Sequence, residues 1–444
     1  MTILLLLLLL AIVLIILTTS VWKWHPFLAL LLACVCYGIG SGMAPLELVE
    51  TINVGFGTTV GKVGLLIIAG LLIGTFLEKT GGAMVLANSL LRLIGTKRIH
   101  TALGFIGYVV SIPVFADSGF IILASLNKAL TRRAGLSLGG TAVALSMGLM
   151  ASHTMVPPTP GPIAAAAILG ADLGRVILVG LLTSIPALLV VVAFTKFMGN
   201  RIFIEARVNE AEDKPEEASH QPTVTKAFLP ILLPIVLIVF ASVAEYPTRP
   251  FGEGAVYQVF TVLGNPVIAL FGGVLTALLL PRKLDRGMLG TSGWVGEAMR
   301  GAALIILITG AGGAFGEVLK TSPLGEVLEE WITTVSPGLW LPFVLAAVIK
   351  SAQGSSTVAI LTTASIVLPL LDGMGFADGA SRALVVVAIG AGSAVVSHAN
   401  DSFFWVVTQL SDMSVNQGYR LHALGSAVLG VAAFLVLSLL SLVF

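Results

Sequence analysis

Charged residues are scarce in this sequence. Asp, Glu, Lys and Arg make up only 11% of the 444 residues, whereas 57% are hydrophobic and the mean hydropathy is +1.02. A soluble domain carries about 25% charged residues. So few charges cannot cover a water-facing surface, which indicates that lipid is the solvent for most of the chain. The net charge of +1, with no basic run interleaved with aromatics, argues against a nucleic-acid partner.

Cysteine is scarce as well, since Cys34 and Cys36 are the only two and both lie in an apolar stretch. This excludes a disulfide framework and a cysteine metal site, so no metal is expected. The segment 57–63 is too short for a phosphate loop and lacks its final Ser or Thr. With no nucleotide motif and no cofactor expected, an ion gradient is the predicted energy source.

Enzyme motifs are also lacking. Residues 135–139 match Gly-x-Ser-x-Gly, but the strand–turn–helix context of a hydrolase nucleophile is missing. No enzyme activity is therefore predicted. An intramembrane hydrolase using Ser137, Ser152 or Ser397 stays open as an alternative.

Long apolar segments predict an all-α polytopic membrane protein with about ten spans. A spanning helix needs about 20 mostly apolar residues. The N-terminal leucine run lacks a basic n-region and a small-residue cleavage pattern, so we interpret it as a retained first span. Two interrupted spans with polar, Gly- or Pro-rich centres are predicted at 138–170 and 383–409. The other spans are predicted at 3–20, 26–43, 60–78, 176–199, 228–244, 262–281, 300–319 and 422–444.

Residues 99–130 and 339–370 each hold two short apolar arms around a polar centre. An arm of about 14 residues makes about 21 Å of helix, which is too short for a hydrocarbon core of about 30 Å. Each segment therefore predicts a re-entrant hairpin. Irregular backbone at that depth must be buried by protein or line a watery cavity.

Polar residues at 205–226 predict a cytoplasmic linker. When loops alternate and both hairpins re-enter, most Lys and Arg fall on one side of the membrane. That side should be the cytoplasm, which places both termini outside it.

The linker separates two halves, 1–204 and 227–444, in which similar short motifs recur in the same order. Each half holds five spans and one hairpin, and because five is odd the second half is predicted to be inverted. Inverted repeats with broken helices are typical of secondary transporters. The matched positions are Gly70 with Gly312, Gly74 with Gly316, Ser152 with Ser397, His153 with His398, Asp172 with Asp412, and the hairpin centres Asp117 with Gln353.

Asp117 is an ionisable residue at the centre of the first hairpin. A charge at membrane depth costs at least about 2.5 kcal/mol unless it is hydrated, paired or protonated. We predict that Asp117, with Ser118 and Gly119, binds substrate and that Asp117 exchanges a proton. Capping of the following helix is the alternative.

Four prolines between Pro157 and Pro162 must unwind the first interrupted span. The helix is expected to restart near Pro162. Its free N–H groups and positive dipole end suit a carboxylate, although a structural kink is the alternative. The substrate-binding residues predicted here are Ser152, Thr154, Thr159 and Gly161.

The second hairpin centre offers amide, hydroxyl and backbone donors that can bind a carboxylate or sugar hydroxyls. Helix packing through small residues is the alternative. The predicted substrate-binding residues are Gln353, Gly354, Ser355, Ser356 and Thr357.

The second interrupted span adds Ser397, Asn400 and Ser402 to this set. Asp401 is predicted to couple protons, with a helix cap as its alternative. His153 and His398 occupy matched repeat positions and titrate near neutral pH, so they are predicted to relay protons.

Three motifs resemble the gluconate permease (gluconate:proton symporter, GntP) family. They are Val156–Pro162, Gln353–Ala359, and Ser397–Ser402 followed by Phe404-Trp405. The resemblance implies proton-coupled uptake of a small organic anion, gluconate or a related sugar acid, across the bacterial inner membrane. Some members take D-serine, idonate or fructuronate.

The wider ion-transporter superfamily implies a homodimer with scaffold and transport domains that works by an elevator motion. By this analogy the hairpins and interrupted spans form the moving part. Gluconate-type members often carry Glu near the position of Asp117, so the exact substrate stays open. A sodium-coupled carboxylate carrier is the nearest alternative, because exposed carbonyls can bind sodium. An ion channel fits less well, since nothing repeats as a pore filter.

Overall fold

The structure, a computed structural model, describes residues 2–95, 98–206, 221–244, 251–323, 338–399 and 401–442. These residues form helices joined by turns and short extended segments, with no strand among them. The all-α prediction is confirmed for this part of the chain. Most of the predicted linker 205–226 lies outside the described residues.

The helices of the first half are α1 (Thr2–Ile16), α2 (Pro26–Gly40), α3 (Pro45–Lys79), α4 (Gly82–Ile94), α5 (Ile99–Val110), α6 (Ala116–Ala134), α7 (Leu138–Met155), α8 (Pro160–Leu169) and α9 (Leu173–Arg201). Those of the second half are α10 (Val224–Ala244), α11 (Ala255–Leu263), α12 (Pro266–Ala277), α13 (Arg286–Leu289), α14 (Trp294–Thr321), α16 (Trp340–Gln353), α17 (Ser356–Val367), α18 (Gly379–Ala394), α19 (Ser402–Leu410), α20 (Val415–Gly418) and α21 (Leu424–Leu440). Short π-helices are η1 (Leu17–Val21) and η4 (Tyr419–Ala423), and η3 (Leu368–Leu370) is a 3-10 turn.

Proline marks where several helices begin. α2, α3, α8 and α12 each carry proline in the first turn. This position suits proline, because the missing N–H has no intrahelical partner there and the fixed φ is already helical. The helix after the proline-rich segment begins at Pro160, two residues before the predicted restart at Pro162.

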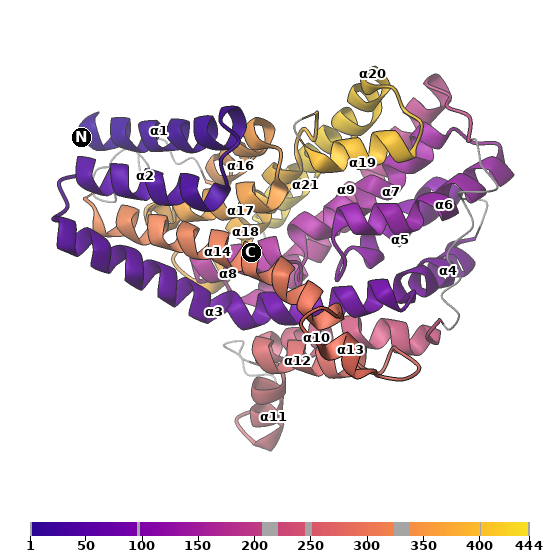
Figure 1. Cartoon of the computed structure of the whole chain (residues 1–444), viewed down its shortest axis with the longest axis horizontal. Helices are drawn as coiled ribbons and strands as arrows, with labels where there is room; N and C mark the ends of the chain where they lie inside the picture. The colour runs from indigo at the N-terminus through magenta and orange to yellow at the C-terminus, as the bar shows by residue number, and fades with distance from the viewer. Residues whose placement is uncertain are drawn as a thin grey trace.

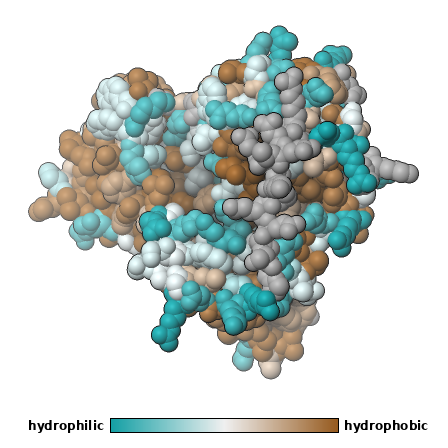
Figure 2. Space-filling model, turned by 45° about the vertical axis from the view of Figure 1, so that its right-hand side comes forward, coloured by the Kyte–Doolittle hydropathy of each residue, from teal (hydrophilic) through white to brown (hydrophobic). Residues whose placement is uncertain are grey.

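Large apolar side chains cover much of the outer surface. Leu46, Leu275 and Leu439 are examples from α3, α12 and α21, and each is more than 60% exposed. Figure 2 shows broad hydrophobic areas on one face, separated by clusters of hydrophilic residues. Contiguous apolar surface of this extent indicates a lipid environment.

Within the described residues, four helical segments are long and apolar enough to cross a membrane, and six if two bent pairs each count as one span. The four are Leu173–Gly199, Val224–Ala244, Arg286–Thr321 and Val415–Leu440. Several apolar helices of 10–17 residues accompany them. These findings fit a membrane protein, while the count of about ten spans stays a prediction.

The long helices α3 and α14 pack along each other and link the two halves (Figure 1). Their matched glycines lie against matched segments. A Cβ at Gly74 would collide with the Pro113 carbonyl between α5 and α6, and one at its match Gly316 would lie 3.3 Å from the Ser365 carbonyl oxygen on α17. Small residues thus let each long helix approach one of the predicted hairpins closely.

Breaks divide the four predicted segments into α5 and α6, α7 and α8, α16 and α17, and α18 and α19. α5, α16 and α17 have 12, 14 and 12 residues, which matches the predicted short arms. α6 is longer, with 19 residues. The interruptions are therefore where the sequence predicts them, and the re-entrant course of the hairpins stays a prediction.

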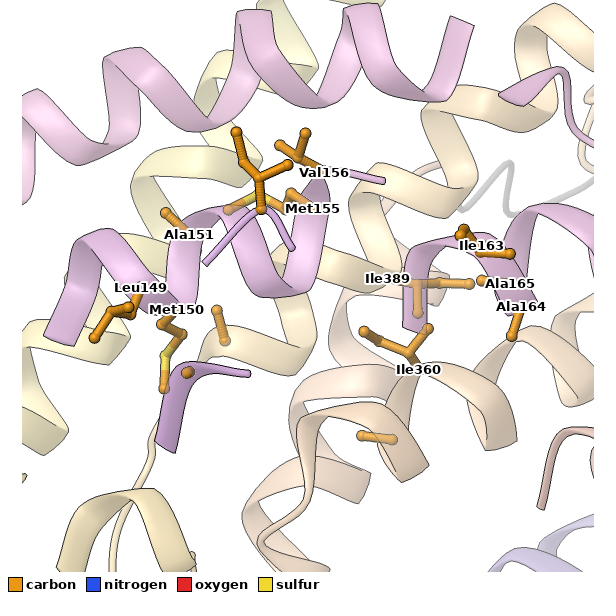
Figure 3. Close-up of a cluster of buried hydrophobic side chains, with 14 of the residues drawn as sticks. Leu149, Met150, Ala151, Met155, Val156, Ile163, Ala164, Ala165, Ile360 and Ile389 are labelled. Carbon is orange, nitrogen blue, oxygen red and sulfur yellow. The ribbon is translucent and has the colours of Figure 1, made fainter. Parts of the chain in front are cut away.

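Helices of each half pack against helices of the other half. α6 of the first half contacts α19 of the second, and α17 of the second contacts α8 of the first. Figure 3 shows Ile360 of α17 and Ile389 of α18 beside Ile163 of α8, and all three are buried. This apolar packing joins the start of α8 to α17 and α18.

Candidate functional site

A cavity of about 310 Å³ lies where three of the breaks meet. Its walls come from the α5–α6 break, the α16–α17 break and the start of α19, with Met150 and His153 from α7. The lining residues are Phe115, Ala116, Asp117, Met150, His153, Gln353, Gly354, Ser355, Ser356, Thr357, Asp401, Ser402 and Phe403. The sequence-based prediction named nine of these residues, and the structure brings them together in one place.

Three helix N-termini converge on this cavity. α6 begins at Ala116, α17 at Ser356 and α19 at Ser402, and all three residues line the cavity. The first N–H groups of a helix have no intrahelical partner, and the helix dipole places partial positive charge there. The cavity is therefore suited to hold an anion.

Asp117 lies in the first turn of α6 and reaches across to the second half. Its Oδ2 accepts a hydrogen bond of 3.2 Å from the Ser402 hydroxyl. A carboxylate thus stands at one of the three N-termini, within the cavity that the dipoles make favourable for negative charge.

Asp401 provides the second carboxylate and forms an ion pair with Lys350. Lys350 Nζ donates to Asp401 Oδ2 at 2.5 Å and to the Gly354 carbonyl at 2.6 Å. The Ser397 hydroxyl also donates to Oδ2, and the Phe403 N–H donates to Oδ1 at 3.0 Å. Asp401 therefore caps α19, as the alternative interpretation predicted, and is also paired with a buried cation.

The sequence-based prediction missed Lys350 and His422. The signal for Lys350 was a lysine in the apolar arm 340–353, since an ionisable residue at membrane depth marks a functional site. His422 lies fully buried on the π-helix η4, where its Nε2 is 3.1 Å from Ser397 Oγ and its Nδ1 is 3.3 Å from Ser146 Oγ. Both residues belong to one buried polar network with Asp401.

His153 and His398, predicted as a symmetric pair, lie in different surroundings. His153 lines the cavity beside the Phe115 ring, and its Nδ1 has no hydrogen-bond partner among the described residues. His398 lies outside the cavity lining, with its Nε2 2.8 Å from the Ser351 carbonyl.

Other predicted binding residues lie outside this lining. Three hydroxyls donate to carbonyls of their own segment, Ser152 to Leu149, Thr154 to Met150 and Thr159 to Val156. The remaining positions are Ser118 and Gly119 on α6, Gly161 beside Ile360, and Ser397 behind Asp401. Asn400 lies outside the described residues.

The N-terminus of α8, predicted as the anion site, faces a separate small pocket. Pro158, Thr159 and Pro160 line it together with His153 and Phe115, and its volume is about 10 Å³. This space is of the order of one water molecule and is too small for an organic anion. The other three helix N-termini therefore offer the larger space for a ligand.

Comparison with known proteins identifies a family. The family model described as GntP family permease matches residues 3–443. A gluconate permease of Pseudomonas aeruginosa is 33% identical over 439 residues, covering 95% of this chain and 94% of that protein. The D-serine transporter DsdX of Escherichia coli is 32% identical over 425 residues, with the same two coverages. The inner membrane permease YgbN of Escherichia coli is 31% identical over 427 residues and 93% of each chain.

A solved structure shares the fold. The YdaH transporter of Alcanivorax borkumensis, described as having an unusual topology, matches with a TM-score of 0.59 over 90% of each chain. The sequence identity is 18%, so this likeness concerns the fold alone.

Proposed function

Because this chain belongs to the GntP family of permeases, we propose that it is a secondary active transporter that takes up gluconate or a related hydroxy acid with protons. Membership makes the chain a permease rather than an enzyme. The proposed location is the bacterial inner membrane, in keeping with the name of the relative YgbN.

The observation that carries this proposal is the convergence of three helix N-termini on one cavity. The substrate carboxylate is proposed to lie against the first turns of α6, α17 and α19. Fixed N–H groups and dipoles bind an anion without bringing a counter-charge of their own into the membrane.

The polar residues of the α16–α17 break are proposed to bind the substrate hydroxyls. Gln353, Ser355, Ser356 and Thr357 line the cavity and offer both donors and acceptors. The Ser356 hydroxyl donates to the Ser393 carbonyl at 2.9 Å, so its oxygen remains able to accept a hydrogen bond. The volume of about 310 Å³ suits a small polyhydroxy acid.

Asp117 is proposed to carry the coupled proton. Two unit negative charges about 4 Å apart repel by roughly 4 kcal/mol at an effective dielectric constant of 20. A substrate anion beside Asp117 therefore favours protonation of that carboxyl group. Asp401 is instead neutralised by its ion pair with Lys350, so it is not proposed to take up the proton. The further roles predicted for His153, His398 and Asp401 in proton transfer stay predictions.

Alternating access is proposed to follow an elevator motion in a homodimer. The breaks that line the cavity would move as the transport domain, and the two halves would form inverted repeats with both termini outside the cytoplasm. The reciprocal packing of α6 on α19 and of α17 on α8 supports a relation between the halves.

D-serine is a second candidate substrate, and a specific observation favours it. Its amino group would need a carboxylate, and Asp117 presents one in the cavity. The relative DsdX is named a D-serine transporter. An ionised Asp117 would thus suit a zwitterion, whereas a protonated Asp117 would suit a sugar acid.

An uptake screen in proteoliposomes tests the proposal. Purified protein would be given an inward proton gradient and radiolabelled gluconate, idonate, glycerate, fructuronate or D-serine. We expect a sugar acid to accumulate only when the gradient is present. Accumulation of D-serine alone would select the second candidate, and accumulation of none of the five would contradict the proposal.

A further inference from the structure

Lys350 is a fully buried cation that the substrate cavity does not touch directly. It is 1% exposed, and among the described residues no other Lys or Arg is buried. The side chain lies directly behind Gly354 and Asp401, which do line the cavity. A charge in such a place must be matched by nearby groups, because an unpaired buried charge costs several kcal/mol.

The two oxygen atoms that bind the ammonium form a cation site. Gly354 is the C-terminal cap of α16, and its carbonyl stands at the negative end of that helix dipole. Asp401 comes from the unwound segment before α19. In transporters with broken helices, unwound carbonyls and the C-terminal ends of half-helices are the groups that coordinate a coupling cation.

Residues from both halves of the molecule stabilise this site. The Ser397 hydroxyl fixes the same oxygen of Asp401 that Lys350 binds, and His422 fixes Ser397 in turn. His422 also contacts Ser146 of α7. Asp401 is therefore held by hydrogen bonds from groups other than Lys350 as well.

We propose that the Lys350 ammonium is a tethered cation that takes the place of a coupling sodium ion between Gly354 and Asp401. The inference rests on the proposed function, because it concerns which ion the transport cycle uses. With a lysine in the site, the carboxylate of Asp401 is neutralised without sodium. Truncation of Lys350 would leave a carbonyl and a carboxylate facing an empty space, which is a hard-oxygen site for a free cation.

This role differs from the proton coupling predicted for Asp401. In the tethered-cation account, Asp401 is the fixed partner of Lys350, and Asp117 remains to exchange a proton. The alternative interpretation is that Lys350 only stabilises the C-terminal end of α16, since a lysine near a helix C-terminus is favourable in itself. The two interpretations differ in what sodium does to a variant that lacks the lysine.

The test measures the thermal stability of the purified full-length protein with sodium alone as the ligand. Tm is recorded in NaCl and in choline chloride of equal ionic strength, with no organic substrate present. We expect no sodium-specific change in wild type, and a saturable rise of roughly 2 °C or more in Lys350→Ala. Lys350→Ala combined with Asp401→Asn should lose that rise.

Lys128→Ala is the matched control, because Lys128 pairs with Asp412 at 3.8 Å outside the cavity. It should show no sodium-specific rise. The proposal is overturned if wild type shows the rise, or if Lys350→Ala lacks it. If Lys350→Ala is recovered as folded protein only when sodium is present during extraction, the proposal is supported. Recovery in neither salt would overturn it.

The measurement is independent of the transported substrate. A chain that carried no sugar acid would still show the sodium response of Lys350→Ala. Gluconate uptake by wild type in sodium-free choline buffer tests the proposed function separately, so a failure of one account is distinguishable from a failure of the other.

Discussion

The hydroxyl of Ser402 donates a hydrogen bond to Asp117, although 285 residues separate them in the sequence. Asp117 lies in the first turn of α6 of the first half, and Ser402 begins α19 of the second. The two helices also pack against each other. This contact joins the carboxyl group proposed to carry the proton to the opposite wall of the cavity.

Asp117→Asn should uncouple transport from protons. The amide resembles the protonated carboxyl group, so substrate binding should persist while the pH dependence of uptake is lost. Proton-driven accumulation of gluconate should fall by about tenfold or more, equivalent to at least roughly 1.4 kcal/mol. Radiolabelled uptake with and without a proton gradient measures this effect.

Asp412→Asn is the control for Asp117→Asn, since Asp412 pairs with Lys128 outside the cavity. Its uptake should match that of wild type. If Asp117→Asn accumulated gluconate to the wild-type level with an unchanged pH profile, Asp117 would not be the proton carrier.

Thr357→Val should weaken substrate binding. The change keeps the shape of the side chain and removes the hydroxyl of a residue that lines the cavity. Loss of one hydrogen bond costs about 1 kcal/mol, so the apparent KM for gluconate should rise about fivefold. Initial rates of uptake over a range of gluconate concentrations measure the change.

The same helix supplies the control for this variant. Thr363 is buried on α17, and its hydroxyl has no hydrogen-bond partner among the described residues. Thr363→Val should therefore leave the KM unchanged. Equal KM values for the two variants would argue against a substrate contact at Thr357.

Gly74→Ala should destabilise the protein. A Cβ at this position would collide with the Pro113 carbonyl, and backbone cannot yield as a flexible side chain does. Overpacking of this kind costs typically 1–3 kcal/mol. Gly57→Ala on the same helix meets nothing within 4 Å and is the control. Thermal unfolding should show a lower Tm for Gly74→Ala only, and equal Tm values would contradict the close approach.

Asp378→Ala should destabilise the N-terminus of α18, outside the spans. Asp378 Oδ1 accepts hydrogen bonds of 2.7 Å from the N–H groups of Ala380 and Ser381. The bond from Ser381 N–H is the main cause that lowers the pKa of Asp378 below its ordinary value. Loss of such a cap costs about 1 kcal/mol.

The pH dependence of this cost follows from the direction of the shift. A carboxyl group with a lowered folded-state pKa stabilises the protein above its ordinary pKa of about 3.9, and this stabilisation is lost as the pH falls through the folded-state value. The Tm difference between wild type and Asp378→Ala should therefore be present at neutral pH and shrink in acid. A difference that grew on acidification would refute this assignment.

Local sequence was enough to predict the breaks in the helices. The prolines between Pro157 and Pro162 cannot continue a helix, and the polar centre at Gln353–Thr357 interrupts an apolar pattern. These signals act within a few residues, so they can be read without knowledge of the fold. The helix that begins at Pro160 and the turn at Gly354 follow from them.

The composition of the site depends on contacts that local patterns do not encode. Lys350 and Asp401 are 51 residues apart, and the sequence around either residue does not identify the other as its partner. The sequence indicated an anion site at the start of α8, because prolines mark that helix start most strongly. Packing instead brings the starts of α6, α17 and α19 to the larger cavity.

Lumenal pH during gluconate uptake tests the central claim most directly. Proteoliposomes with a pH-sensitive dye inside and sodium-free buffer on both sides would receive external gluconate. Proton symport predicts that the lumen acidifies with wild type and stays unchanged with Asp117→Asn. Entry of radiolabelled gluconate through wild type without any change in lumenal pH would contradict the account.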